Sequence, residues 1–225
     1  MKKKILYIIP TPIGNLKDIS YRSIEILNYT QLIIVENINR TLKLLKFYKI
    51  KKKIIKYNKI NESYKINNII KYINKNNINI ITLLTDAGYP SISDPGYLLI
   101  NKFIKLKISI SCLPGSNSIL PSLIVSGFPI EEFTFIGFLT KKNIKNKIKK
   151  IKNENRTIVF FDSPHRFITT LKILIKILGK NRNIIIYKEI SKIYEKIIRG
   201  SIKKIYDKYK NLKIKGELTY VINYK

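Results

Sequence analysis

Residues 82–97 read TLLTDAGYPSISDPGY, a pattern that stands out from a chain rich in Ile, Lys, Asn and Tyr. Two glycines, two prolines and two aspartates follow its apolar start. Glycine permits backbone conformations and close ligand approach that a side chain forbids, and proline fixes φ. The pattern therefore predicts a strand that ends in a loop, with the next helix starting at Pro95. In open α/β sheets, loops at the carboxyl ends of strands bind ligands.

Outward from this segment, short apolar runs alternate with segments of helical periodicity. The strands are predicted at residues 5–9, 32–36, 79–84, 108–112, 133–136, 157–161, 184–188 and 218–223. The helices are predicted at residues 20–28, 40–48, 63–75, 95–105, 117–126, 164–178 and 201–210. The alternation predicts an α/β protein with largely parallel sheets. The Pro-Gly turn at 114–118 predicts an N-terminal α/β domain, 1–113, and a C-terminal α/β domain, 114–225, with a ligand in the cleft between them.

The charge of the chain is strongly one-sided, with 44 Lys and Arg against 14 Asp and Glu and a net charge of +30. Basic side chains that neutralise phosphates drive nucleic-acid binding, so a polyanion such as RNA is an expected partner. However, Ile, Lys, Asn and Tyr all have A/T-rich codons, and the lysines are spread along the chain. The charge therefore fits RNA without proving it. The lysine run at 141–152 is interpreted as a solvated helix face or as an RNA contact.

Several classes of protein are disfavoured by what the sequence lacks. No apolar run approaches the about 20 residues of a membrane span, and the basic then apolar start is interpreted as a first strand and not a signal peptide. The lone Cys112 excludes an internal disulfide, and the single histidine with scattered carboxylates makes no metal-ligand set. The glycine motifs of dinucleotide folds and P-loops are missing. We expect a cytoplasmic protein that holds no metal.

Residues 94–95 and 163–164 each combine a capping side chain with a proline suited to the first helical position. A structural role is therefore predicted for Asp94, with a further functional role left open. His165 and Arg166 would lie in the first turn of a helix that directly follows a strand. There they would offer cationic groups to an anionic ligand, or serve the fold alone. A Ser-His-Asp hydrolase using His165 would be expected to show a G-x-S-x-G elbow, which the chain lacks.

Taken together, the ordered motifs resemble the tetrapyrrole (corrin/porphyrin) methylase superfamily, and more closely its members that methylate ribosomal RNA. The matching segments are LYIIPTPIGNLKDI at 6–19, DAGYPSISDPGY at 86–97, LPG at 113–115, GFL at 137–139, SPHR at 163–166, KEISK at 188–192 and GE at 216–217. The resemblance spans nearly the whole chain. The D-A-G-x-P-x-I-S-D-P-G pattern is highly specific, whereas the short matches are not.

The resemblance implies two α/β domains with mainly parallel or mixed sheets, S-adenosylmethionine (SAM) in the cleft between them, and a homodimer. It implies methylation of the 2′-oxygen of a cytidine ribose in the decoding region of 16S rRNA, so the partner is the small ribosomal subunit. On family grounds the cofactor contacts are Pro12, Asp86, Ala87, Gly88, Ile92, Ser116 and Leu139. As a hypothesis, the reaction cleft is lined by Asp94, Asp162, His165, Arg166 and Glu189. Arg166 would hold an RNA phosphate, and a carboxylate or His165 would take the proton.

The chain departs from the family pattern in three places. The family motif Glu-Asp-Thr-Arg is replaced by Glu36-Asn37-Ile38-Asn39, with Arg40 one place later, so that only Glu36 is expected to retain a role there. Asp162 replaces the usual Glu before SPHR. The sequence also ends just after the last predicted strand, so we expect the C-terminal segment of many relatives to be absent.

Two alternatives remain open at this point. The first is a methyltransferase of the same superfamily that acts on a small molecule or a protein. The second is a non-catalytic rRNA-binding or ribosome-assembly factor, in which the altered residues 36–39 mark lost activity.

Overall fold

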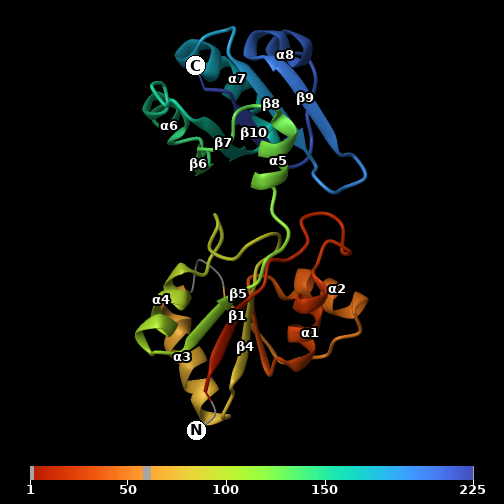
Figure 1. Cartoon of the computed structure of the whole chain (residues 1–225), viewed down its shortest axis with the longest axis vertical. Helices are drawn as coiled ribbons and strands as arrows, with labels where there is room; N and C mark the ends of the chain where they lie inside the picture. Colours follow the sequence, from red (N-terminus) through yellow and green to blue (C-terminus); the bar gives the residue numbers. More distant parts are fainter. Residues whose placement is uncertain (1–2, 58–61, 225) are drawn as a thin grey trace. The chain divides into compact units, whose positions relative to one another are not determined.

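The computed structural model of the chain describes residues 3–57 and 62–224. The chain forms two compact units, Met1–Asn117 and Ser118–Lys225, which we call unit 1 and unit 2. Each unit is built around one five-stranded sheet (Figure 1). The described helices include none that is long and apolar enough to cross a membrane.

Unit 1 contains a parallel sheet with the strand order β3-β2-β4-β1-β5. Its strands are β1 (Ile5–Ile8), β2 (Leu32–Val35), β3 (Ile54–Lys56), β4 (Ile80–Leu84) and β5 (Ser109–Cys112). Its helices are α1 (Tyr21–Tyr29), α2 (Ile38–Phe47), α3 (Glu62–Lys75) and α4 (Tyr97–Lys105).

Both faces of the unit 1 sheet are covered by helices. Helices α3 and α4 lie on one face and α1 and α2 on the other (Figure 1). Along β2, Leu32 and Ile34 pack into the first cluster, whereas Ile33 and Val35 pack into the second. All four are buried because successive side chains of a strand point to opposite faces. Because helices cover both faces, a ligand can reach this sheet only at the ends of its strands.

Unit 2 contains a mixed sheet with the strand order β6-β7-β10-β8-β9. Its strands are β6 (Phe133–Phe138), β7 (Thr157–Asp162), β8 (Asn183–Lys188), β9 (Lys196–Ser201) and β10 (Leu218–Ile222). Its helices are α5 (Ile119–Ser126), α6 (Ile144–Lys150), α7 (Phe167–Leu178) and α8 (Ile202–Tyr209), with the 3-10 helix η1 (Pro164–Arg166) before α7.

The helices of unit 2 also cover both faces of their sheet. Helices α6, α7 and α8 pack on one face around Phe160, Tyr220 and Ile186. Helix α5 packs on the other face, where Leu123 contacts the cluster of Val159, Ile185 and Val221. Only β6 and β7 are parallel, since β10 runs antiparallel to both β7 and β8, and β9 returns from β8 as a hairpin.

The predicted α/β class with parallel and mixed sheets is confirmed, and the predicted strands and helices are found with shifted ends. Strands β3 and β9 were missed because their Lys-Ile-Ile runs match the background of the whole chain. The predicted helix start at Pro95 is wrong. Helix α4 begins at Tyr97 after Gly96, whose φ of +146° turns the backbone there, so Asp94 is not its capping residue. The predicted cap at Ser163 is confirmed in position, although its side chain makes no capping bond.

Candidate functional site

The loops that follow β1, β4 and β5 meet at one edge of the unit 1 sheet. Ile8 lies opposite Leu83 of β4 and opposite Cys112 of β5, so the three strands end at the same level. Because these strands are parallel, their carboxyl ends share that edge. Six of the predicted cofactor residues follow these ends: Pro12, Asp86, Ala87, Gly88, Ile92 and Ser116.

Hydrogen bonds tie these loops to one another. The backbones of Thr11 and Gly88 bond in both directions at 2.9 Å, and Thr11 Oγ1 donates to the Thr85 carbonyl at 3.1 Å. Gly88 has φ of +74°, in the left-handed region that favours glycine. The Gly115 amide donates to the Tyr89 hydroxyl at 2.9 Å, and the Ser116 hydroxyl donates to the Asp18 carbonyl. Segments that are distant in sequence thus form one connected edge.

Asp86 presents a buried acceptor at this edge. Its Oδ2 lies 3.4 Å from Arg40 Nη1, whereas its Oδ1 is buried and has no hydrogen-bond partner among the residues described. Burial raises the pKa of Asp86, although Arg40 and the backbone at Asn37 both act to lower it. An unsatisfied buried oxygen is costly, so a donor from a bound ligand would stabilise this carboxylate.

Residues 36–40 are built onto the same edge. Glu36 Oε2 accepts a hydrogen bond from Thr85 Oγ1 at 3.1 Å. Arg40 also reaches Asp86 across the loops, so the structure places a second residue of this segment at the edge, and the expectation of a role for Glu36 alone stays a prediction. Arg40 lies one residue later than the arginine of the family motif. It is still in the first turn of α2 and close enough to pair with Asp86.

The edge of unit 2 gathers the later motifs. Asp162 of β7, Leu218 of β10 and Lys188 of β8 stand side by side across the sheet. Ser163, Glu217 and Glu189, each the next residue beyond these strand ends, therefore lie along one edge. Leu139 joins them at the end of β6, where its amide donates to the Phe161 carbonyl at 2.9 Å.

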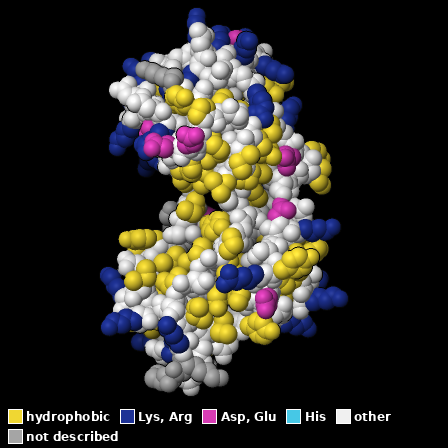
Figure 2. Space-filling model, viewed as in Figure 1, with side chains coloured by type: hydrophobic (Ala, Val, Ile, Leu, Met, Phe, Trp, Pro, Cys, Tyr) yellow, Lys and Arg dark blue, Asp and Glu magenta, His cyan; other side chains and the backbone are white. Residues whose placement is uncertain are grey.

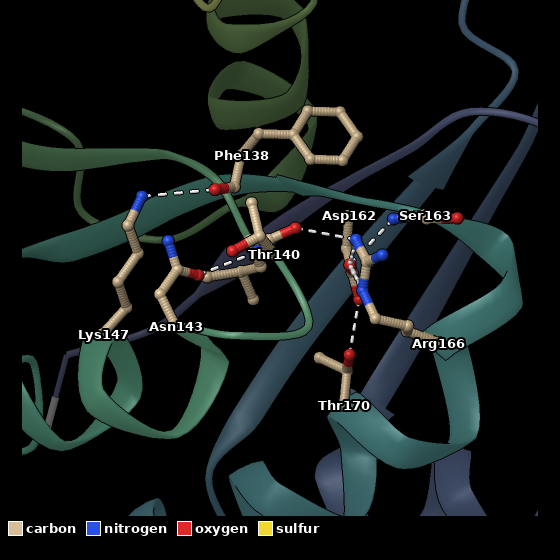
Figure 3. Close-up of polar contacts among 9 residues, drawn as sticks. Phe138, Thr140, Asn143, Lys147, Asp162, Ser163, Arg166 and Thr170 are labelled. Atoms are coloured by element: carbon tan, nitrogen blue, oxygen red, sulfur yellow. Dashed lines mark hydrogen bonds and ion pairs between the residues drawn. The ribbon is translucent and has the colours of Figure 1, made fainter.

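Asp162 is the centre of a buried network in unit 2 (Figure 3). Its side chain is 0% exposed, and Arg166 donates to Oδ1 from Nη2 at 2.7 Å and from Nε at 3.0 Å. The Ser163 amide also donates to Oδ1 at 2.8 Å, and Thr170 Oγ1 donates to Oδ2 at 2.5 Å. Arg166 Nη2 reaches the Leu139 carbonyl at 2.7 Å. The pair therefore fixes the end of β6 against the start of α7.

The turn from β6 into α6 is held by three further hydrogen bonds, made by Lys147 and Thr140 (Figure 3). Lys147 Nζ donates to the Ile136 carbonyl at 2.7 Å and to the Phe138 carbonyl at 3.2 Å. The Thr140 amide donates to Asn143 Oδ1 at 2.8 Å. Lys147 thus bonds the irregular strand end around Gly137, which differs from the solvated or RNA-contact face interpreted for the run 141–152.

Glu189 belongs to a second network at the edge of unit 2. Lys192 Nζ lies 3.0 Å from Glu189 Oε1 and 2.9 Å from Glu217 Oε2, and the Glu217 amide donates to Glu189 Oε1 at 2.7 Å. Burial acts to raise the pKa of Glu189, but these hydrogen bonds and the Lys192 charge outweigh it and lower the pKa. A Cβ at Gly216 would lie 2.4 Å from Glu189 Cγ, so only glycine fits there.

Comparison with known proteins assigns the chain to a family. The sequence profile of the Tetrapyrrole (Corrin/Porphyrin) Methylases matches residues 5–206. The chain belongs to this methylase family. It is 37% identical over 97% of its length to "Ribosomal RNA small subunit methyltransferase I" of Thermotoga maritima, covering 97% of that relative. It is 37% identical to the protein of the same name from Bacillus subtilis, over 97% of this chain and 74% of that one.

Solved structures support the fold of this methylase. Uroporphyrin-III C-methyl transferase from Thermus thermophilus, complexed with S-adenyl homocysteine, superposes with a TM-score of 0.67 at 12% identity, covering 98% of this chain and 97% of that one. Cobalt precorrin-4 methyltransferase superposes with a TM-score of 0.67 at 16% identity, covering 97% of this chain and 94% of that one. Both likenesses show the architecture of the two units.

The five proposed catalytic residues of this methylase lie in different settings. Asp94 is in the 85–96 loop of unit 1, and the other four are in unit 2. The fold brings Asp162 and Arg166 into contact, places Glu189 in the separate Lys192 network, and leaves His165 exposed on η1. Sequence reasoning missed the partners Thr170 and Thr85, because no spacing pattern connects them to the residues that they bind. It also missed Lys192, although this residue lies three positions after Glu189.

Proposed function

We propose that this chain transfers a methyl group from SAM to the 2′-oxygen of a cytidine ribose in the decoding region of 16S rRNA. The observation that carries the proposal is 37–39% identity over 97–99% of the chain to proteins named ribosomal RNA small subunit methyltransferase I. The cytoplasm, where ribosomes are found, is the compartment we propose, and a homodimer is the assembly.

The surface charge supports an RNA substrate. In the view of Figure 2, Lys and Arg side chains are spread over both units and greatly outnumber Asp and Glu. This agrees with the net charge of +30, which attracts phosphates without selecting a sequence. Recognition would then rest on shape, backbone and ribose contacts, as is usual for structured RNA.

SAM suits the edge of unit 1. Its hydroxyl and ammonium groups are donors of the kind that the buried Asp86 Oδ1 lacks. The left-handed turn at Gly88 carries no side chain that would keep a ligand from the backbone. Pro12, Ala87, Ile92 and Ser116 complete the proposed contacts in unit 1, and Leu139 is the proposed contact from unit 2.

When bound, SAM would supply a methyl carbon on a positively charged sulfur; the 2′-oxygen would bond to that carbon from the opposite side as the carbon–sulfur bond breaks and S-adenosylhomocysteine leaves. The protein's main contribution is then to hold the 2′-oxygen behind that carbon. A ribose hydroxyl is a poor nucleophile, so a base that accepts its proton helps. His165, which is exposed on η1, is the proposed acceptor and Asp94 is the alternative; Asp162 and Glu189 are held in ion pairs. Arg166 uses Nε and Nη2 within the fold, so its proposed phosphate contact would use Nη1.

The direct test is methyl transfer from labelled SAM to small ribosomal subunits that lack the modification, followed by digestion and mass spectrometry. Label on a cytidine ribose of the decoding region is the expected result, with subunit binding that weakens steeply as salt rises. Binding without transfer would favour the assembly factor. Neither binding nor transfer would favour a small-molecule or protein methyltransferase.

Gly115→Ala is expected to weaken SAM binding about 10- to 100-fold, since an overpacked side chain costs about 1–3 kcal/mol. A Cβ at this position would lie 2.5 Å from Cγ of Pro10, whose ring cannot rotate away. The loop that carries Ser116 must therefore shift. Isothermal titration calorimetry with SAM measures the change.

Gly179→Ala is the control for the glycine substitution. Gly179 lies in unit 2 with φ of +94°, and an added Cβ would meet nothing within 4 Å. It imposes backbone strain without touching the proposed site, so SAM affinity should stay within about twofold. Equal losses from the two substitutions would contradict a SAM site at the unit 1 edge.

A further inference from the structure

The loop between β8 and β9 exposes two bulky side chains at its tip. Ile193 is 95% exposed and Tyr194 is 75% exposed. The same loop also contains Lys and Glu residues, whose charged side chains are better suited to contact with water. We call residues 189–195 the tip loop. Large apolar groups presented together on a protruding loop are a feature of contact surfaces.

The tip loop is firmly built. The Ser191 amide donates to Glu195 Oε2 at 2.7 Å, and the hydroxyl of the buried Tyr187 donates to Glu195 Oε1. Burial, together with the Glu195 carboxylate, raises the pKa of Tyr187 to about 12, so this hydroxyl keeps its proton as a donor. At the other end, Lys192 joins Glu189 to Glu217. The loop is thus anchored on both sides of its exposed tip.

Strain in the backbone accompanies this anchoring. Glu189 has φ of +53° and Ser191 has φ of +64°, in a region that residues other than glycine seldom adopt. Successive turns hold them there, with the Lys192 amide donating to the Glu189 carbonyl at 3.0 Å and the Glu195 amide to the Lys192 carbonyl at 3.1 Å. Strained conformations of this kind persist where surrounding contacts enforce them, often at functional surfaces.

Cations stand at the base of the loop. Lys188 Nζ donates to the Tyr194 carbonyl at 3.3 Å and lies 6.0 Å from the centre of the Tyr194 ring. Lys196 faces Lys188 across the hairpin and is exposed, and Arg199 follows on the same strand. An exposed ring flanked by cations matches the chemistry of unpaired nucleotides, whose bases stack and whose phosphates are negative.

We propose that Tyr194 is a stacking platform for an unpaired base of the RNA substrate, with Lys188 and Lys196 contacting the phosphates beside it. This inference rests on the proposed function, because it takes RNA as the substrate. Because the loop is already anchored, it loses little conformational entropy on binding, so little of the stacking free energy is spent on ordering the loop. Tyr194 binds RNA in this scheme and takes no part in the chemical step.

The test uses the full chain with Tyr194→Ala, Tyr194→Phe and Tyr29→Ala. Fluorescence anisotropy measures binding of a labelled unpaired oligoribonucleotide and of small ribosomal subunits, and initial rates give KM and kcat. Tyr194→Ala should weaken RNA binding about 5- to 100-fold and raise the KM for subunits with kcat nearly unchanged. Tyr194→Phe keeps the ring and should stay within about twofold.

Tyr29→Ala is the matched control because Tyr29 is 65% exposed at the end of α1, next to the amino ends of the unit 1 strands. It should leave RNA binding unchanged. SAM affinity and the unfolding midpoint should be the same in all variants.

Unchanged RNA affinity in Tyr194→Ala would overturn the inference. Methyl transfer by the native chain would still support the proposed function in that case. Dissociation of a dimer by Tyr194→Ala, seen by sedimentation with unaltered RNA affinity, would overturn it in favour of contact with a second copy. Tyr194-dependent RNA binding without any methyl transfer would support the inference and refute the proposed function.

Discussion

Asp162→Ala is expected to lower the free energy of unfolding by about 3–5 kcal/mol. The substitution removes a carboxylate with a 0% exposed side chain and leaves the Arg166 guanidinium, which is only 24% exposed, without its anion. It also removes the acceptor of Thr170 Oγ1 and of the Ser163 amide. Breaking a buried pair from one side costs much more than the pair contributes, because the remaining charge keeps its desolvation cost.

Urea unfolding followed by circular dichroism measures this change. If the two units unfold in separate transitions, the loss should be confined to the transition of unit 2, where the network lies. Asp207→Ala is the matched control, since Asp207 pairs with Lys203 at 2.7 Å with the same i,i+4 spacing but with side chains 46% and 50% exposed. Exposed pairs contribute about 0–1 kcal/mol. Similar losses from the two substitutions would refute the buried-network account.

His165→Ala is expected to lower kcat for methyl transfer about 10²- to 10⁴-fold, the usual effect of removing a general base. His165 is exposed on η1, directly after the strand that ends in Asp162. The carboxylates of Asp162 and Glu189 are held in ion pairs with Arg166 and Lys192, whereas the His165 side chain is exposed. Initial rates at saturating SAM and small ribosomal subunits give kcat.

Asp94→Asn tests the alternative base, and Thr169→Ala, an exposed substitution at the start of α7, is the control that should keep full activity. The His165 substitution should leave the unfolding midpoint and RNA affinity unchanged. If His165→Ala and Asp94→Asn both retained full turnover with unchanged folding, neither residue would be the base.

The α/β architecture and the positions of the glycine- and proline-containing motifs relative to the strands could be predicted from the sequence. Apolar runs such as 32–35 and 80–84 form strands because fully covered sheets require continuous apolar segments. Glycine and proline at 88–96 predicted a loop after β4, and parallel pairing then brought that loop next to those after β1 and β5. These features depend on local periodicity and on general rules of sheet topology, which a sequence displays directly.

Which polar groups meet depends on contacts that form only in the folded chain. Arg40 reaches Asp86, Thr170 reaches Asp162 and Glu189 packs on Gly216, through contacts that no local spacing pattern predicts. The same carboxylate type can serve as a base or as a buried anchor, and burial with paired cations is what separates the two. In the sequence, Tyr194 is one of many Tyr residues and nothing distinguishes it. The fold places it, exposed, on a loop that hydrogen bonds anchor. Long-range packing therefore sets which of the candidate polar groups are buried and paired.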